Sequence, residues 1–451
     1  MLPVRFLRPA ALDYLEYDAS FSRWLVGVAG TTAGALLWAM PDKTMAFRFL
    51  SRVHRSGGSH LATAFIERVL AGATRRERSG RTTGLWDFYD EHTRRSVQLP
   101  QANGIVKNPL SLLGYRVMVL KSWSPGERGV LVIDYSYIFP ILAALFDVEA
   151  IARRYHLVLE PSWRGLCTAD ILSYSRYNFP VFVESVEPRD IAFIEGLGAN
   201  FRTVPIAANW WVDHRLVAPE PGVERDIDVI MVAAWSGIKR HWRFFQVLAG
   251  LRARGHRLSV ALVGYKTDRN RDHIEEDARV LGVLDQITFH EGLTLQQVGR
   301  LLARAKIHVL WSRKEGANRA IVEALFADVP IIVRSGLSYG HVYPYVNPET
   351  GRFADESTLG DTLLDMIAHR DTYHPRQWAL ANMSCQRATR ILEQHIRREA
   401  VTAGESWSRG LVVKTVHLES QRYWDPDDMR RFKADYDYVA SCARPVPATV
   451  A

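Results

Sequence analysis

Short apolar runs alternate with amphipathic stretches over most of the chain, and this alternation constrains the fold more than any other feature. The runs are rich in branched residues, as expected for strands buried on both faces of a parallel sheet. Such strands are predicted at residues 129–134, 157–160, 181–184, 203–207, 228–234, 259–264, 287–291, 308–312 and 331–333. Helical patterns fill the gaps, for example at 241–254 and 295–305. Repeated strand–helix alternation predicts an α/β fold with right-handed crossovers.

Residues 219–225 divide these strands into two groups. The segment reads Pro-Glu-Pro-Gly-Val-Glu-Arg, and its turn-forming residues are typical of a linker. A chain of 451 residues is long enough for two domains. Ligands of parallel sheets bind at the carboxyl ends of the strands, so two such domains that face each other are expected to form a cleft for a ligand.

Two glutamates, Glu315 and Glu323, follow the strand predicted at 308–312. Glu315 precedes Gly316 in a loop, and Glu323 lies in a helical pattern of apolar residues. If the eight-residue step from Glu315 to Glu323 is treated as helical, the chain advances by about 12 Å and the two positions lie about 80° apart. One ligand can then contact both carboxylates. An isolated pair at this spacing is ordinarily two surface glutamates, but the strand, loop and helix around this pair all fit a ligand site.

The loop before this helix offers free N–H groups to an anion, and Gly316 allows close approach of the backbone. Carboxylates instead accept hydrogen bonds from hydroxyl groups. A sugar nucleotide carries both phosphates and hydroxyl groups. Backbone amides that bind a phosphate, placed beside carboxylates that bind hydroxyl groups, are therefore the recognition groups that it needs.

Residues 315–326 resemble the nucleotide-sugar motif of the retaining glycosyltransferases of family four (glycosyl transferases group 1), which have a GT-B fold. Other stretches resemble the same family at 204–213, 228–239, 287–293 and 347–353, with Lys239 at the lysine position of the phosphate loop. The resemblance implies two Rossmann-like domains facing a cleft. It predicts an N-terminal helical extension at 1–110, an acceptor domain at 111–218, a nucleotide-sugar-binding domain at 226–400, and a tail at 401–451 that packs back on the acceptor domain.

Three positions depart from the family pattern. Ala234 stands where members usually carry an arginine, whose charge Arg240 or Arg319 could supply. Asn209-Trp210 replaces the usual Asn-Gly. The glycine-rich loop after the first strand is missing, because Tyr135-Ser136-Tyr137 follows that strand.

The resemblance assigns roles to individual residues. Lys239 would stabilise the departing diphosphate, Glu315 would hold the donor sugar, and Glu323 would hold the ribose hydroxyls. Lys239 and Glu315 are therefore the catalytic candidates. The further candidates for donor binding are Gly237, Arg240, His290, Gly316, Ala317, Asn318 and Arg319. The acceptor-side candidates, each near a predicted strand end, are Tyr135, Glu160, Trp163 and Glu184. A lone histidine such as His290, and each acceptor-side residue, is also common as a structural group.

Preorganised cations and amides aimed at the leaving diphosphate lower the barrier of such a transfer. In folds of this type side chains do the work of a metal, and no acidic pair of the metal-binding kind stands at a predicted strand end. We therefore expect no metal and no other cofactor.

The net charge of +8 implies an anionic partner. No zinc spacing or RNA-binding motif is present, so nucleic acid is not expected. A nucleotide sugar, an anionic membrane surface or a mildly basic enzyme explains the charge equally well. Cys167, Cys385 and Cys442 lie far apart, and no cleavable signal peptide is evident. Both observations predict a cytoplasmic protein.

Residues 24–40 form an uncharged run at the lower length limit for a membrane-spanning helix. Tryptophans near both ends fit a membrane interface, and seven arginines follow between Arg52 and Arg81. This combination is typical of a peripheral anchor on the inner face of the cytoplasmic membrane. A buried helix in an N-terminal extension explains the run equally well.

These patterns favour a metal-independent, retaining hexosyltransferase that moves a sugar from a nucleotide sugar to a glycan, a lipid-linked acceptor or another hydroxyl acceptor in polysaccharide or glycolipid biosynthesis. An epimerase or a phosphorylase of the same fold is a rival, although no lysine context for pyridoxal phosphate is evident. A catalytically silent relative that serves as a nucleotide- or glycan-binding assembly subunit is a second rival. Ala234 favours that rival, whereas the joint presence of Lys239, Glu315 and Glu323 argues against it.

Overall fold

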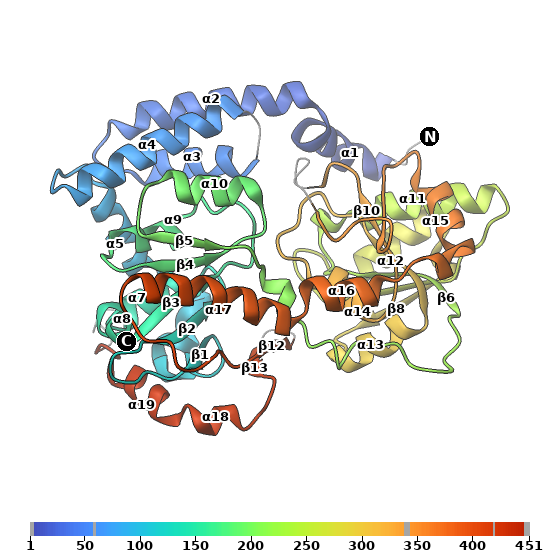
Figure 1. Cartoon of the computed structure of the whole chain (residues 1–451). Coiled ribbons are helices and arrows are strands. Elements are labelled where there is room, and N and C mark those ends of the chain that lie inside the picture. Colours follow the sequence, from blue (N-terminus) through green and yellow to red (C-terminus); the bar gives the residue numbers. More distant parts are fainter. Residues whose placement is uncertain (1–3, 57–59, 338–342, 418–419, 446–451) are drawn as a thin grey trace. The chain divides into compact units, whose positions relative to one another are not determined.

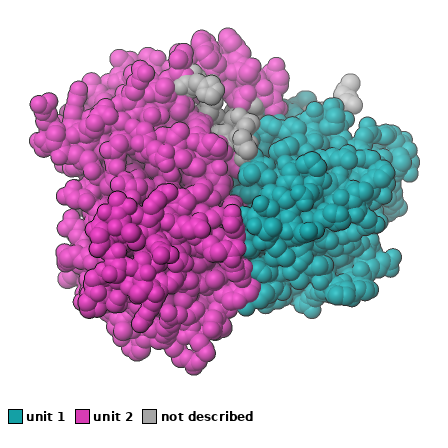
Figure 2. Space-filling view, in the orientation of Figure 1, with its two compact units in different colours: residues 1–13, 212–384 teal, residues 14–211, 385–451 magenta. Residues whose placement is uncertain are grey.

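The computed structural model describes residues 4–56, 60–337, 343–417 and 420–445 (Figure 1). The chain divides into two compact units, coloured in Figure 2. Unit 1 comprises residues 1–13 and 212–384, and unit 2 comprises residues 14–211 and 385–451. The segment predicted as an N-terminal extension is therefore divided between the two units, and the predicted C-terminal tail belongs to unit 2.

Unit 1 is built on a six-stranded parallel sheet with the order β11-β10-β9-β6-β7-β8. Its strands are β6 (Ile227–Val232), β7 (Val260–Gly264), β8 (Ile287–Glu291), β9 (Ala305–Leu310), β10 (Ile331–Arg334) and β11 (Gly351–Ala354). Its helices are α1 (Leu7–Asp13), α11 (His241–Ala253), α12 (Arg271–Val280), α13 (Leu295–Ala303), α14 (Arg319–Phe326), α15 (Leu359–Ala368) and α16 (Pro375–Met383). Side chains of Asn270, Thr294 and Asn318 cap the helices that follow them, which fixes where α12, α13 and α14 begin.

Unit 2 is built on a five-stranded sheet with the order β1-β2-β3-β4-β5. The strands are β1 (Val117–Lys121), β2 (Gly129–Asp134), β3 (Tyr155–Glu160), β4 (Val181–Glu184) and β5 (Phe201–Val204). Strands β2 to β5 are parallel, and β1 pairs with β2 in the antiparallel direction. A separate antiparallel hairpin is formed by β12 (Lys414–His417) and β13 (Ser420–Tyr423).

Helices cover this sheet and form the N-terminal part of unit 2. They are α2 (Ser20–Trp38), α3 (Thr44–Ser56), α4 (His60–Arg78), α5 (Leu85–Ser96), α6 (Asn103–Lys107), α7 (Ile138–Leu145), α8 (Val148–Arg154), α9 (Ala169–Leu172), α10 (Pro188–Gly196), α17 (Cys385–Thr402), α18 (Asp428–Arg431) and α19 (Lys433–Ser441). Apolar residues of α3, α4 and α5 belong to the same hydrophobic core as the sheet. In Figure 1, α2 lies on the outer side of this helical layer, away from β4 and β5.

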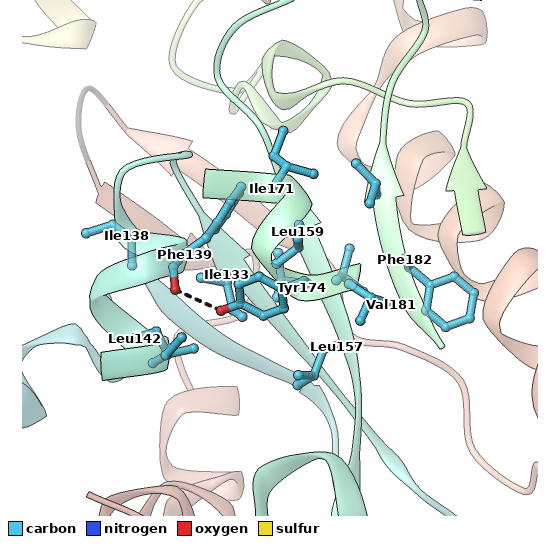
Figure 3. Packing of buried hydrophobic residues seen from close by; sticks show 14 of the residues in the cluster. Ile133, Ile138, Phe139, Leu142, Leu157, Leu159, Ile171, Tyr174, Val181 and Phe182 are labelled. Carbon is cyan, nitrogen blue, oxygen red and sulfur yellow. Dashed lines mark hydrogen bonds between the residues drawn. The ribbon is translucent and has the colours of Figure 1, made fainter. Parts of the chain in front are cut away.

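The hydrophobic core of unit 2 surrounds the inner strands of its sheet, and this burial explains why these strands are continuous apolar runs. Side chains from α7, α9 and the inner strands interdigitate around Tyr174 (Figure 3). The Tyr174 hydroxyl donates a hydrogen bond to the carbonyl oxygen of Phe139 at 2.8 Å, so the one polar atom of this ring is satisfied within the core.

The predicted α/β class with parallel sheets is confirmed by both units. Strands β2, β4 and β8 have the predicted bounds, whereas the strand predicted at 308–312 spans Ala305–Leu310. Strands β1 and β11 and the β12–β13 hairpin were not predicted. Within the described residues, no helix is long and apolar enough to cross a membrane.

Candidate functional site

The loops that follow β6 and β9 meet in unit 1 because these strands are neighbours in the sheet. Lys239 ends a short 3-10 helix, Gly237–Lys239, and its Nζ lies 2.5 Å from Oε1 of Glu315. Glu315 is 6% exposed. The Arg313 backbone N–H donates to the carbonyl oxygen of Ile238 at 2.9 Å, which joins the two loops through the main chain as well. The structure therefore brings the two catalytic candidates into direct contact.

The loop after β6 is held in shape by its own polar groups. Ser236 accepts a hydrogen bond from the Ile238 amide, and the Gly237 amide donates to Oδ2 of Asp268 at 3.1 Å. Burial acts to raise the pKa of Asp268, but hydrogen bonds from Ser236 and Gly237 outweigh it and lower the pKa. The Asp268 carboxylate, which follows β7 in the chain, thus holds the loop after β6 in place.

Helix α14 begins at Arg319, where the Asn318 side chain accepts a hydrogen bond from the Ile321 amide at 3.1 Å. The predicted placement of Glu315 in the loop and of Glu323 in the helix is confirmed, whereas the eight-residue helical spacing between them is wrong, because the helix begins only at Arg319. Gly316 and Ala317 share that loop. The amino end of α14, with its backbone N–H groups and positive helix dipole, follows Glu315 by four residues in the chain.

Glu323 lies in the second turn of α14 and is partly buried. Burial raises the pKa of its carboxyl group, and the positive charge of Arg319 lowers it in part. Arg319 and Glu323 are four residues apart on α14, so their side chains lie on the same side of this helix.

Arg240 follows Lys239 directly but has a different environment. Its guanidinium is buried, with Nε 3.0 Å from Oδ2 of Asp13 and Nη2 2.8 Å from Oε1 of Glu356. Arg313 contacts the same Asp13 carboxylate. Arg240 also has a left-handed backbone conformation, with φ 54°. Asp13 was missed from the sequence, because nothing near the start of the chain marks a residue that pairs with a loop 227 positions away.

His290 lies on β8, at the edge of the sheet and two strands from β6. It lines a groove of about 450 Å³ between α13 and the linker, together with Glu220, Val223, Leu293, Gln297, Arg300, Leu301 and Arg304. Burial and the charges of Arg304 and Arg271 lower the pKa of His290. Neither Lys239 nor Glu315 lines this groove.

Two acceptor-side candidates, Glu160 and Glu184, are buried in unit 2 at the carboxyl ends of β3 and β4. The ammonium of Lys414, from β12, contacts the Glu160 carboxylate, and both side chains are 0% exposed. Trp211 Nε1 donates to Oε2 of Glu184 at 3.3 Å. Burial raises the pKa of Glu160 well above its usual range and that of Glu184 to about 7. These carboxylates are thus covered by the β12–β13 hairpin and by Trp211.

The other two acceptor-side candidates differ from this pair. Trp163 is 57% exposed. Tyr135 has a left-handed backbone conformation (φ 67°), and the Arg116 guanidinium lies 4.3 Å from the centre of its ring. The tight turn after β2 thus forms at a tyrosine, without the glycine that the family pattern has there.

Within the described part of the chain, no three His, Cys, Asp or Glu side chains are grouped as a metal site.

Residues 216–361 match the family model described as "Glycosyl transferases group 1", and this match covers less than half of the chain. The domain includes Lys239, Glu315 and the amino end of α14. None of the curated proteins matches the sequence. The match and the two parallel-sheet units confirm the GT-B fold class predicted from the sequence.

Several solved structures are similar to the chain at low sequence identity. TarM of S. aureus is 12% identical, with a TM-score of 0.45, over 59% of this chain and 53% of its own, so the chain spans about half the length of TarM. Sucrose-phosphate synthase from Thermosynechococcus elongatus is 15% identical, with a TM-score of 0.44, over 61% of this chain and 74% of its own. Anabaena HepE, solved in complex with UDP-glucose, is 14% identical, with a TM-score of 0.45, over 60% of this chain and 78% of its own.

Proposed function

We propose that this protein is a retaining, metal-independent hexosyltransferase that moves a sugar from a nucleotide sugar to a hydroxyl group of a glycan or lipid-linked acceptor, in polysaccharide or glycolipid biosynthesis. One observation carries the proposal. A lysine and a glutamate from two neighbouring strand ends are in contact, and the glutamate lies four residues before a helix amino terminus, within a group 1 glycosyl transferases domain.

The pair has the charges that a donor needs. A diphosphate accepts hydrogen bonds from the Lys239 ammonium and from amides at the amino end of α14. Because Lys239 contacts Glu315, a bound diphosphate competes with that carboxylate for the ammonium. Glu315 is then available to accept hydrogen bonds from hydroxyl groups of the donor sugar.

The chemical step follows from the same arrangement. Negative charge grows on the diphosphate as the glycosidic bond breaks, and the preorganised ammonium of Lys239 stabilises it. Glu315 orients the sugar while Glu323, further along α14, accepts hydrogen bonds from the ribose. Within this proposal the leaving phosphate accepts the proton of the acceptor hydroxyl on the same face, so the anomeric configuration is retained.

The test is calorimetric titration of the protein with UDP, GDP and ADP, each with magnesium and with a chelator. We expect one nucleotide to bind equally well in both conditions. Lys239→Ala should weaken that binding at least about tenfold, since a hydrogen bond to a charged group is removed. Lys306→Ala is the matched control, because Lys306 lies in β9 of the same sheet and pairs with Asp228 at 2.7 Å; it should leave binding unchanged.

Glu315→Ala separates binding from chemistry. Release of nucleotide from the matching nucleotide sugar should fall at least about a hundredfold, while the nucleotide alone should bind as tightly as before or more tightly, since Lys239 has lost a competing partner. Binding of no nucleotide would overturn the proposal. Nucleotide binding without any sugar release or transfer would instead identify the chain as a silent assembly subunit.

A further inference from the structure

Residues 4–13 belong to unit 1, although the rest of that unit begins only at residue 212. This segment comprises the 3-10 helix Val4–Phe6 and α1, and we call it the N-terminal clasp. It lies beside the start of α11 (Figure 1). Helix α11 directly follows residues 233–240, which we call the Lys239 loop.

An aromatic stack joins the clasp to α11. The ring centroids of Phe6 and Trp242 are 5.2 Å apart, and the two ring planes are inclined by only 6°. Both side chains are buried. Trp242 is the second residue of α11. The stack therefore fixes the first turn of the helix that leaves the Lys239 loop.

Between Lys239 and α11 the chain passes through Arg240, which has a left-handed conformation with φ 54°. A residue with a Cβ keeps this conformation only where its surroundings impose it. The clasp supplies part of these surroundings, because Asp13 pairs with the buried Arg240 guanidinium while Phe6 holds the helix that follows. Loss of the clasp would let Arg240 relax, and the direction of the Lys239 side chain would change with it.

The other end of the clasp reaches the start of the same loop through two intermediate residues. Nη2 of Arg5 lies 2.9 Å from Oδ1 of Asp277, a buried residue of α12. Oδ2 of the same carboxylate pairs with Arg269 at 2.7 Å. The Arg269 backbone N–H donates to the carbonyl oxygen of Trp235 at 3.1 Å. The clasp is thus connected to this loop near its start as well as at its end.

We infer that the N-terminal clasp positions Lys239, so that Phe6 and Arg5 act as positioning residues for the diphosphate of the donor. Both side chains act through the Lys239 loop and not through the ligand. The inference rests on the proposed function for the identity of the ligand, whereas the order that the clasp gives to the loop is a property of the free protein. The two can therefore fail separately.

The first test is hydrogen exchange of the full-length protein without nucleotide. In Phe6→Ala the amides of Gly237 and Arg313, which donate hydrogen bonds that hold the loops of the site, should exchange at least about fivefold faster. The amides of β7 should exchange as in the native protein, which shows that unit 1 remains folded. Leu12→Ala is the matched control, because Leu12 is exposed on the same clasp; it should leave both amides unchanged.

The second test is a double-mutant cycle on the affinity for whichever of UDP, GDP and ADP the native protein binds. Phe6→Ala should weaken binding about fivefold in the native background, less than the loss of at least about tenfold expected for Lys239→Ala. In the Lys239→Ala background the same substitution should change binding by less than about twofold, because the ammonium that the clasp positions is no longer there. A general structural effect on unit 1 would instead reduce the affinity equally in both backgrounds.

Arg5→Gln is a milder variant, since Arg5 is half-exposed, and it decides the question if Phe6→Ala does not fold. It should weaken binding about threefold in the native background and should have no effect beside Lys239→Ala. Unchanged exchange of the two loop amides in Phe6→Ala, or equal losses of affinity in the two backgrounds, would overturn the inference. Faster exchange in a protein that binds no nucleotide would show that the clasp orders the loop and that the proposed function is wrong.

Discussion

Asp13 and Arg240 form a buried ion pair within unit 1. Nε of Arg240 lies 3.0 Å from Oδ2 of Asp13, and each side chain is 1% exposed. Arg313 contacts the other oxygen of the same carboxylate. One residue near the start of the chain therefore ties the loop that carries Lys239 to the loop that carries Glu315.

Asp13→Asn should lower the free energy of unfolding by about 3 kcal/mol, because it leaves buried guanidinium groups without a carboxylate. The affinity for the donor nucleotide should also fall, since the two loops lose a shared anchor. Urea denaturation and calorimetry measure the two effects. Asp437→Asn is the control, because Asp437 is exposed and pairs with Lys433 at the surface; it should change the free energy of unfolding by no more than about 1 kcal/mol and should leave the affinity unchanged. An Asp13→Asn protein with native stability would contradict the structural role of the pair.

Glu323→Gln should weaken nucleotide binding about tenfold and should remove part of its pH dependence. Burial raises the pKa of Glu323. The ionised carboxylate accepts stronger hydrogen bonds from the ribose hydroxyls, so affinity should increase as the pH rises through this raised pKa and should be lost on acidification.

Calorimetric titration of the native and Glu323→Gln proteins across this pH range measures the difference. Glu349→Gln, at an exposed position of unit 1, controls for a general effect of charge. If the Glu323→Gln protein keeps the full pH dependence, another group is responsible for it.

The parallel strands could be predicted because strands buried on both faces carry continuous apolar runs. All residues of β2 and β4 are buried, and these strands have the predicted bounds. The β12–β13 hairpin, Lys-Thr-Val-His and Ser-Gln-Arg-Tyr, has no such run. Its residues pair because of contacts elsewhere in unit 2, such as the hydrogen bond from the Tyr423 hydroxyl to the Val119 carbonyl oxygen at 2.7 Å.

Some contacts of the candidate site could likewise be predicted from the sequence and others could not. Lys239 and Glu315 could be predicted to approach each other, because each follows a recognisable strand of one sheet. Asp13 and Lys414 could not, because their partners are distant in sequence and their own neighbours carry no motif. The burial of Arg240 was missed for the same reason, since a lysine–arginine sequence after a strand gives no sign that the two side chains have different environments.

Glu184 should make the stability of unit 2 decrease as the pH rises. Its folded-state pKa is about 7 against an ordinary value of 4.5, because burial disfavours the charged form. A group with a raised pKa contributes stability that is present below pH 4.5 and is lost as the pH rises to about 7. The contribution is of the order of 3 kcal/mol.

Glu184→Gln tests this contribution, because glutamine keeps an acceptor for Trp211 Nε1 and does not titrate. The free energy of unfolding from urea denaturation should fall less steeply with pH for the variant, which should become more stable than the native protein above about pH 7. Parallel curves for the two proteins would show that Glu184 does not titrate in this range.

Lys414→Met should destabilise unit 2 by about 3 to 5 kcal/mol at a pH where Glu160 is ionised, because it leaves the buried Glu160 carboxylate without its cation, and by less at a lower pH, where the raised pKa keeps Glu160 neutral. Asp134 and Glu184 act on Glu160 with the same negative charge, which increases the cost. Lys433→Met is the matched control. Lys433 is exposed on α19, where it pairs with Asp437 at 2.6 Å, and its loss should cost no more than about 1 kcal/mol.

The double variant Lys414→Met/Glu160→Gln should recover most of the lost stability, because no uncompensated charge then remains buried. Hydrogen exchange of the β12–β13 hairpin should be fast in Lys414→Met and slow again in the double variant. This cycle also separates two roles for Glu160. Recovery of both stability and sugar transfer would make Glu160 a partner of the hairpin alone, whereas recovery of stability without transfer would keep it as an acceptor-side residue.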